Sequence, residues 1–270
     1  RRCRSQVANS AIATGGSSSV CTSRATPTAR GIASTRRKSA RVRCRHSPAR
    51  LRSEAKANMV AEEVRAAGGT PWIGIVDIAD MIAVDDIVSR FAEAFGGIDT
   101  AVASAGVAST GTLTSTAPEE WHRMINTNLN GTYYFARAVM PELIQAKGSF
   151  VAISSDAGVQ GAQGYAAYST SKHALHGLIK CMALDYGPQG VRSHAVCPAF
   201  VETPMADKLL ASATQQEVEY FKSTIPLGRF AQPSEVADAV AHLTSAEAAF
   251  ANGVLYRLDG GSTAGYFMGG

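Results

Sequence analysis

From Glu54 onward, short apolar runs alternate with amphipathic stretches of helical length, and this alternation constrains the fold more than any other feature. The apolar runs lack polar residues at every second position, so each is expected to be buried on both faces. Strands of this kind, separated by helices, are typical of a parallel sheet covered on both sides. We therefore predict a single α/β domain over residues 54–270, with a doubly wound, Rossmann-like parallel sheet.

The order of the predicted elements places polar and small residues at one edge of that sheet. Ligands of doubly wound sheets bind at the carboxyl ends of the strands. Three of the predicted strands end in the tripeptide 104–106, in Ser154-Ser155 and in 197–199. Helices are expected over 54–67, 81–95, a long stretch from Pro118, 166–186 and 233–245, and strands over 70–78, 99–107, 148–155, 191–198 and 253–261.

The first 53 residues have a different composition from the rest of the chain. They contain twelve Arg and one Lys, whereas the first acidic residue is Glu54. The remainder holds 13 basic and 22 acidic residues, which is ordinary for a globular enzyme. We treat residues 1–53 as an aberrant basic segment that needs its own explanation.

Several classes of protein are disfavoured by composition. No run approaches eighteen apolar residues, so no membrane span is expected. The five cysteines are odd in number and form no C-x-x-C pair, which argues against a disulfide scaffold and favours a cytoplasmic protein. His173 and His176 lie three residues apart without further ligands, so no metal is expected, and no nucleic-acid partner is indicated.

Tyr168 and Lys172 lie four residues apart on a predicted helix and therefore share one face. An ammonium near a phenol favours the phenolate, so we expect Lys172 to lower the pKa of Tyr168 toward a value useful for proton transfer. Such a pair is also a common surface arrangement on helices. Ser155 at a strand end and Asn128 within a helix are equally ambiguous when each is taken alone.

The ordered set SAG, NTNLNG, ISS, YSTSK, CPAFVETP and LDGG resembles the short-chain dehydrogenase/reductase family, in its short single-domain branch. The resemblance covers residues 54–262. It implies a catalytic group in which Tyr168 is the general acid/base, Lys172 lowers its pKa and holds the nicotinamide ribose, and Ser155 orients the substrate oxygen. Asn128 would anchor a water that relays protons from Lys172.

The resemblance also implies a binding site for NAD or NADP. Asp77 would bind the adenine amino group, with Ile78 beside it. Ser104, Ala105 and Gly106 match the family's N-A-G segment, with Ser in place of the Asn that braces the central sheet. Pro198, Val201 and Thr203 match the segment that lines the nicotinamide carboxamide, although Ala199 stands where Gly is usual.

The resemblance therefore predicts an oxidoreductase that transfers a hydride between nicotinamide and a secondary alcohol or ketone, in a homodimer or homotetramer. A catalytically silent binding or regulatory protein is the alternative. The N-terminal segment favours the catalytically silent protein, because neither residues 14–20 nor residues 26–33 keep the spacing of a phosphate-binding glycine turn.

Three explanations of residues 1–53 compete. The segment is a targeting peptide, an adaptation in which Arg43 or Arg45 binds the 2′-phosphate of NADP, or the product of a reading-frame error. The segment is rich in Arg and Ser, contains no acidic residue and ends abruptly near Glu54, and these features favour the reading-frame error. Sequencing the gene tests this hypothesis, and one uninterrupted frame that encodes these residues would contradict it.

Overall fold

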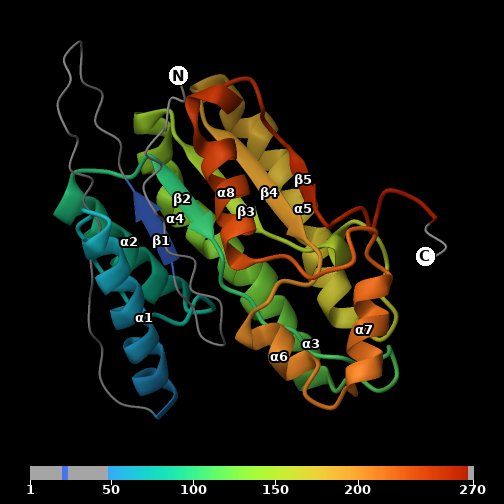
Figure 1. The fold of residues 1–270 in the computed structure, drawn as a ribbon. Helices are drawn as coiled ribbons and strands as arrows, with labels where there is room; N and C mark the ends of the chain where they lie inside the picture. Colours follow the sequence, from blue (N-terminus) through green and yellow to red (C-terminus); the bar gives the residue numbers. More distant parts are fainter. Residues whose placement is uncertain (1–19, 24–47, 267–270) are drawn as a thin grey trace.

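The computed structural model describes residues 20–23 and 48–266, in which a five-stranded sheet lies between layers of helices (Figure 1). Most of the basic segment 1–53 falls outside the described residues. The strands are β1 (Val20–Ser23), β2 (Thr100–Ala103), β3 (Ser149–Ile153), β4 (Arg192–Pro198) and β5 (Leu255–Leu258).

The helices agree closely with the predicted ranges where apolar residues recur at helical spacing in the sequence. The predicted helices over 81–95 and 166–186 have the predicted ends, and the first helix starts at Pro48, six residues before the expected boundary at Glu54. None of the helices in the described ranges is both long and apolar enough to span a bilayer. The helices are α1 (Pro48–Ala66), α2 (Met81–Phe95), α3 (Pro118–Ile125), α4 (Gly131–Ala146), α5 (Ala166–Tyr186), α6 (Pro204–Leu209), α7 (Gln215–Ser223) and α8 (Pro233–Thr244), with a π-helical turn η1 (Asn126–Asn130) and short 3-10 turns η2 (Asp156–Gly158), η3 (Gly187–Gln189) and η4 (Ala246–Ala248).

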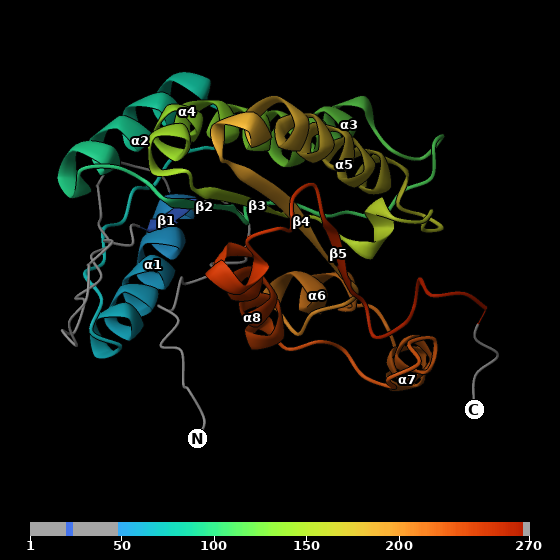
Figure 2. The ribbon, with the colours of Figure 1, turned by 90° about the horizontal axis from the view of Figure 1, so that it is seen from above.

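The five strands lie in the order β1-β2-β3-β4-β5, and the pairs from β2 to β5 are parallel. Helices α2, α4 and α5 cover one face of the sheet, whereas α1, α6 and α8 lie on the other (Figure 2). This arrangement confirms the predicted α/β fold. The edge strand β1 differs, because it runs antiparallel to β2, with Val20 opposite Ala103.

The strand predicted over 70–78 does not form as a continuous strand. Thr70, Trp72 and Gly74 make only isolated bridge contacts in this stretch. A strand is stabilised by a neighbour that pairs along its length, and no described strand runs beside these residues. The apolar run still predicted burial correctly, since Val76 and Ile78 belong to the core.

Two apolar clusters hold the helices to the sheet. Side chains alternate along buried strands, so Val102, Val151 and Val196 face α8 while Phe150 faces α4 and α5. Because both faces are buried, the strands are fixed in register and their carboxyl ends lie together at one edge.

Candidate active site

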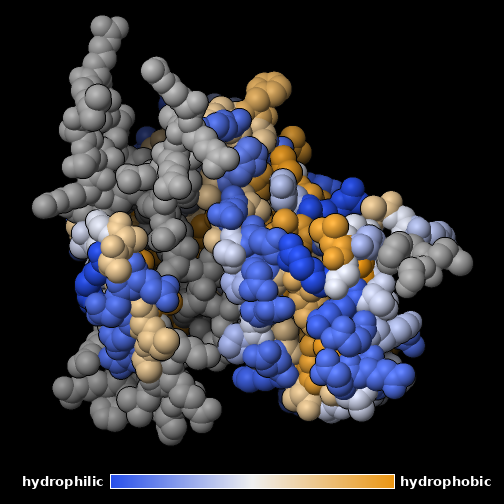
Figure 3. All heavy atoms as spheres, viewed as in Figure 1, coloured by the Kyte–Doolittle hydropathy of each residue, from blue (hydrophilic) through white to orange (hydrophobic). Residues whose placement is uncertain are grey.

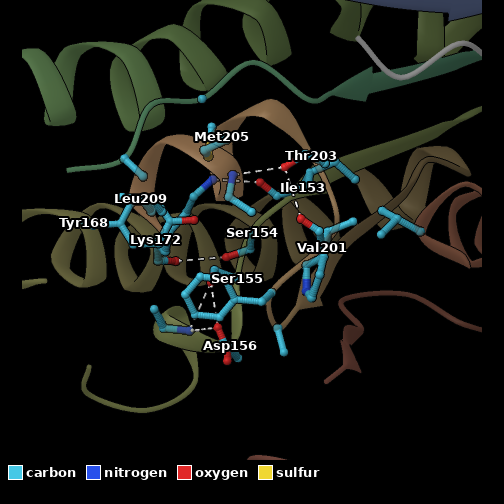
Figure 4. Close-up of a pocket in the computed structure, with 18 of the residues that line it drawn as sticks. Ile153, Ser154, Ser155, Asp156, Tyr168, Lys172, Val201, Thr203, Met205 and Leu209 are labelled. Carbon is cyan, nitrogen blue, oxygen red and sulfur yellow. Dashed lines mark hydrogen bonds between the residues drawn. The ribbon is translucent and has the colours of Figure 1, made fainter. Parts of the chain in front are cut away.

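A cavity of about 210 Å³ lies at the carboxyl ends of the parallel strands. Its walls include residues that directly follow β2, β3 and β4, together with side chains of α5 and α6 (Figure 4). The position agrees with the sequence prediction, because parallel strands of this fold bring their carboxyl ends to the ligand.

Most of the predicted site residues line this cavity. They are Ser104, Gly106, Ser155, Tyr168, Lys172, Pro198, Val201 and Thr203. Four predicted residues are not among the lining residues. Asp77 is exposed and accepts a hydrogen bond from the Ala79 amide, Ile78 is buried, Ala105 packs against the core, and Asn128 lies behind the wall.

Helix α5 presents Tyr168 and Lys172 to the cavity from one face. The Lys172 Nζ lies 5.7 Å from the centre of the Tyr168 ring. The same ammonium donates a hydrogen bond of 2.9 Å to the Ile153 carbonyl at the end of β3, and Lys172 is only 4% exposed. The lysine is therefore held between helix and strand, with N–H groups left over for a ligand.

Burial dominates the proton affinities of this pair. It raises the pKa of Tyr168 to about 12, which a hydrogen bond with Ser155 opposes and the charge of Asp156 reinforces. Burial also lowers the pKa of Lys172 to about 8. Lys172 is not among the causes of this shift, so its expected effect on the pKa of Tyr168 stays a prediction. Loss of water around the phenolate is the largest cause of the raised pKa.

Ser155 ends the β3 segment with its side chain engaged by the next residue. Its hydroxyl donates to Asp156 Oδ1 at 2.8 Å and accepts from the Ala157 amide at 3.2 Å. Burial raises the pKa of the Asp156 carboxyl. Sequence reasoning missed Asp156, although a carboxylate next to a serine at a strand end was a visible signal.

Asn128 lies in the π-helical turn η1 and is fully buried. Its amide oxygen accepts from the Val107 amide at 2.8 Å, and its Nδ2 donates to the Val107 carbonyl at 2.9 Å and to Ser171 Oγ at 3.0 Å. Asn128 thus fixes the loop after β2 against α5. π-Helical turns are frequent at functional sites, where they turn a side chain out of the regular helical phase.

A second polar cluster lies behind Ser155 and was not predicted. His176 Nε2 lies 2.8 Å from Ser154 Oγ and 3.4 Å from Cys197 Sγ, so it joins α5 to the ends of β3 and β4. Burial lowers the pKa of His176 to about 4, which keeps the ring neutral. In the described ranges, no group of His, Cys, Asp and Glu side chains is placed to hold a metal ion.

The cavity fits the nicotinamide end of a dinucleotide. A Cβ at Gly106 would lie 3.6 Å from Lys172 Nζ, so the bare backbone leaves room above the ammonium. The Ser104 hydroxyl, at the position where the family has the bracing Asn, is buried without a partner in the described part of the chain. Thr203 caps α6 through the Ala206 amide, which holds the 198–203 segment at the cavity wall.

A model of a protein family described as enoyl-(acyl carrier protein) reductase matches residues 48–263. The match spans the described domain, and the resemblance drawn from the sequence motifs is confirmed. The chain belongs to the short-chain dehydrogenase/reductase family.

Individual relatives carry different names. The chain is 36% identical to meso-2,3-butanediol dehydrogenase of Serratia marcescens over 70% of this chain and 74% of that protein. It is 33% identical to a Xanthobacter autotrophicus protein named inactive 2-(S)-hydroxypropyl-CoM dehydrogenase 2, over 79% of this chain and 93% of that one. A solved gluconate 5-dehydrogenase from Burkholderia cenocepacia, in complex with NADP and tartrate, matches with a TM-score of 0.74 and 28% identity, over 79% of this chain and 83% of that chain.

The bonds of Asn128 predict a large effect of its removal. Asn128→Ala removes the Asn128 partners of the half-buried Val107 amide and carbonyl, so we expect the free energy of unfolding to fall by about 2 kcal/mol. Urea denaturation followed by circular dichroism measures the loss.

Asn130→Ala is the matched control, because among the described residues the Asn130 side chain bonds Asn126 alone, at the helix surface. Its effect should stay within about 0.5 kcal/mol. Equal losses in the two variants would show that the contacts of Asn128 with Val107 do not stabilise the fold.

Proposed function

We propose that the protein is an oxidoreductase that transfers a hydride between a nicotinamide cofactor and a secondary alcohol or ketone, with Tyr168 as general acid/base. The observation that carries this proposal is the convergence of Ser155, Tyr168 and Lys172 on one cavity at the carboxyl edge of the sheet. Family membership supports it, because the similar proteins named above are dehydrogenases.

The cofactor is NAD or NADP, and it supplies or accepts the hydride when it is bound. In the proposed arrangement Lys172 binds the nicotinamide ribose, since among the described residues its ammonium donates to the Ile153 carbonyl alone, and an ammonium has three donors. Pro198, Val201 and Thr203 line the same cavity, and the proposal assigns the nicotinamide carboxamide to them. Asp77 and Ile78 are proposed to meet the adenine end, away from the cavity.

In ketone reduction, Ser155 holds the substrate oxygen and the Tyr168 hydroxyl gives it a proton as the alkoxide develops. In alcohol oxidation, the Tyr168 phenolate takes the proton from the carbinol. A tyrosine with a pKa of about 12 is protonated at neutral pH, so Tyr168 can donate the proton that ketone reduction requires. Asn128 is proposed to support proton exchange between Lys172 and water.

A catalytically silent relative is the second candidate function. The basic segment 1–53 supports it, because no acidic residue precedes Glu54 and neither glycine stretch has the usual spacing. We propose that this segment replaces the first strand and glycine turn of the family. A similar protein that carries the name inactive gives the alternative further weight. Titration of the protein with NADH or NADPH, followed by nicotinamide fluorescence, separates the two candidates.

Replacement of the proposed acid/base tests the leading function. Tyr168→Phe removes only the hydroxyl, so we expect turnover of secondary alcohols and ketones to fall by at least about 10²-fold while the fold persists. Steady-state assays with each cofactor measure the effect.

Tyr186→Phe, at the other end of the same helix, is the matched control and should retain full turnover. Substantial activity in Tyr168→Phe would refute the role assigned to Tyr168.

The pKa of Tyr168 predicts opposite pH dependences for the two directions. Because the raised pKa keeps the phenol protonated, alcohol oxidation should accelerate as the pH rises toward 12, whereas ketone reduction should not. Asp156 contributes to the raised value through its charge, so Asp156→Asn should move the rise in oxidation to lower pH. An unshifted profile in that variant would show that the Asp156 charge does not act on Tyr168.

A further inference from the structure

Asp156 lines the cavity, and it neither gives nor takes the proton in the proposed reaction. It follows Ser155 directly (Figure 4). Asp156 and Lys172 are the two charged side chains among the described residues that form the walls. Because Lys172 is assigned to the cofactor, Asp156 is the charged group left to face a substrate.

Neighbouring residues in the sequence donate to the Asp156 carboxyl. Oδ1 accepts from Ser155 Oγ at 2.8 Å and from the Ala157 amide at 2.7 Å. The Asp156 carboxyl also receives a bond from its own backbone amide, and none of the ion pairs in the described part of the chain includes Asp156. Burial without a cation disfavours the carboxylate, so a donor supplied by a ligand would stabilise it.

Much of the remaining wall is apolar, although Ser154, Tyr165 and Thr203 also line the cavity. Val107, Phe200, Met205 and Leu209 face the cavity, and the last two come from α6. Apolar side chains also show at the surface between α7 and α8, beside the hydrophilic face of α7 (Figure 3). A single carboxylate in such surroundings binds a hydrogen-bond donor more strongly than it would in open water.

The hydrogen bond between Ser155 and Asp156 competes with the bond that Ser155 would make to a substrate oxygen. A serine hydroxyl has one hydrogen, and Ser155 donates it to Asp156 in this structure, so it can reach Tyr168 or a substrate oxygen only when that bond is given up. Ser155 must redirect that hydrogen to polarise a substrate carbonyl. A substrate hydroxyl that donates to Asp156 replaces the lost bond and so frees Ser155 for the reacting oxygen.

We propose that Asp156 selects substrates that carry a hydroxyl on the carbon next to the reacting carbon, and that it rejects substrates with a carboxylate there. The neighbouring positions of Ser155 and Asp156 carry this inference, since two adjacent polar groups match two adjacent oxygens. It rests on the proposed function, because it takes Ser155 as the group that binds the reacting oxygen. A carboxylate at the same position would place two negative charges together in an apolar cavity.

The test compares ketones that differ in one substituent. In 3-hydroxybutan-2-one a hydroxyl stands where 3-methylbutan-2-one has a methyl group of similar size, and pyruvate carries a carboxylate next to its carbonyl. We expect kcat/KM for the hydroxyketone to exceed that for the methyl analogue at least about tenfold, with pyruvate the poorest substrate.

Variants at Asp156 should change these ratios in opposite senses. Asp156→Ala should bring the hydroxyketone and its methyl analogue to within about twofold of each other, because the acceptor is gone. Asp156→Asn should raise the rate with pyruvate relative to 3-methylbutan-2-one, because the repelling charge is gone. Each ratio is taken within one variant, so a general loss of activity cancels.

Asp207→Asn is the control, since Asp207 is exposed on α6 and does not line the cavity. It should leave both ratios unchanged. A ratio near one in the unmodified protein, or a preference that persists in Asp156→Ala, would overturn the proposal.

Binding measurements separate this proposal from the proposed function. Saturation-transfer NMR on the full chain reports the affinities of the two ketones without turnover. Preferential binding of the hydroxyketone that is lost in Asp156→Ala supports the selectivity of Asp156 even if no reaction is detected, in which case the proposed function fails alone. Equal binding of the two ketones, or no binding of either, contradicts the selectivity.

Discussion

The parallel pairing of β2, β3 and β4 is the constraint on which the cavity depends. Ala103, Ala152 and Ala195 lie side by side across these strands, so the chain leaves the sheet at neighbouring points. Lys172 then joins α5 to the β3 end through the Ile153 carbonyl, and Asn128 joins the loop after β2 to the same helix. Residues that are far apart in sequence thereby form one wall.

Periodic features of the sequence predicted the fold well. The ends of α2 and α5 were predicted correctly, because an apolar stripe and flanking breakers are local properties. The stretch 70–78 makes isolated bridges in place of the predicted continuous strand, because pairing along a strand is not a local property of the composition. The resemblance to the family located the cavity residues, whereas periodicity alone left Tyr168 and Lys172 ambiguous.

The electrostatics of the site could not be predicted from spacing. Tyr168 and Lys172 lie four positions apart, but burial raises the pKa of the phenol, and the charge of Asp156, which becomes a neighbour only after folding, adds to the rise. His176 gave no signal for a similar reason, since its partners Ser154 and Cys197 come from two other elements. Names of similar proteins do not fix the substrate either, because they range from butanediol to gluconate.

The number of residues in the π-helical turn η1 sets how the faces of α3 and α4 are rotated relative to one another. α3 contacts α5, whereas α4 packs on β2, β3 and α2. Successive residues of an α-helix are rotated by about 100°, so one residue more or less between these helices would turn one contact face away from its partner. The wider π-helical turn therefore changes the rotation of α4 relative to α3 about their common axis. Insertions and deletions are therefore more damaging at 126–130 than conservative substitutions, even though this turn lies inside a continuous helical rod.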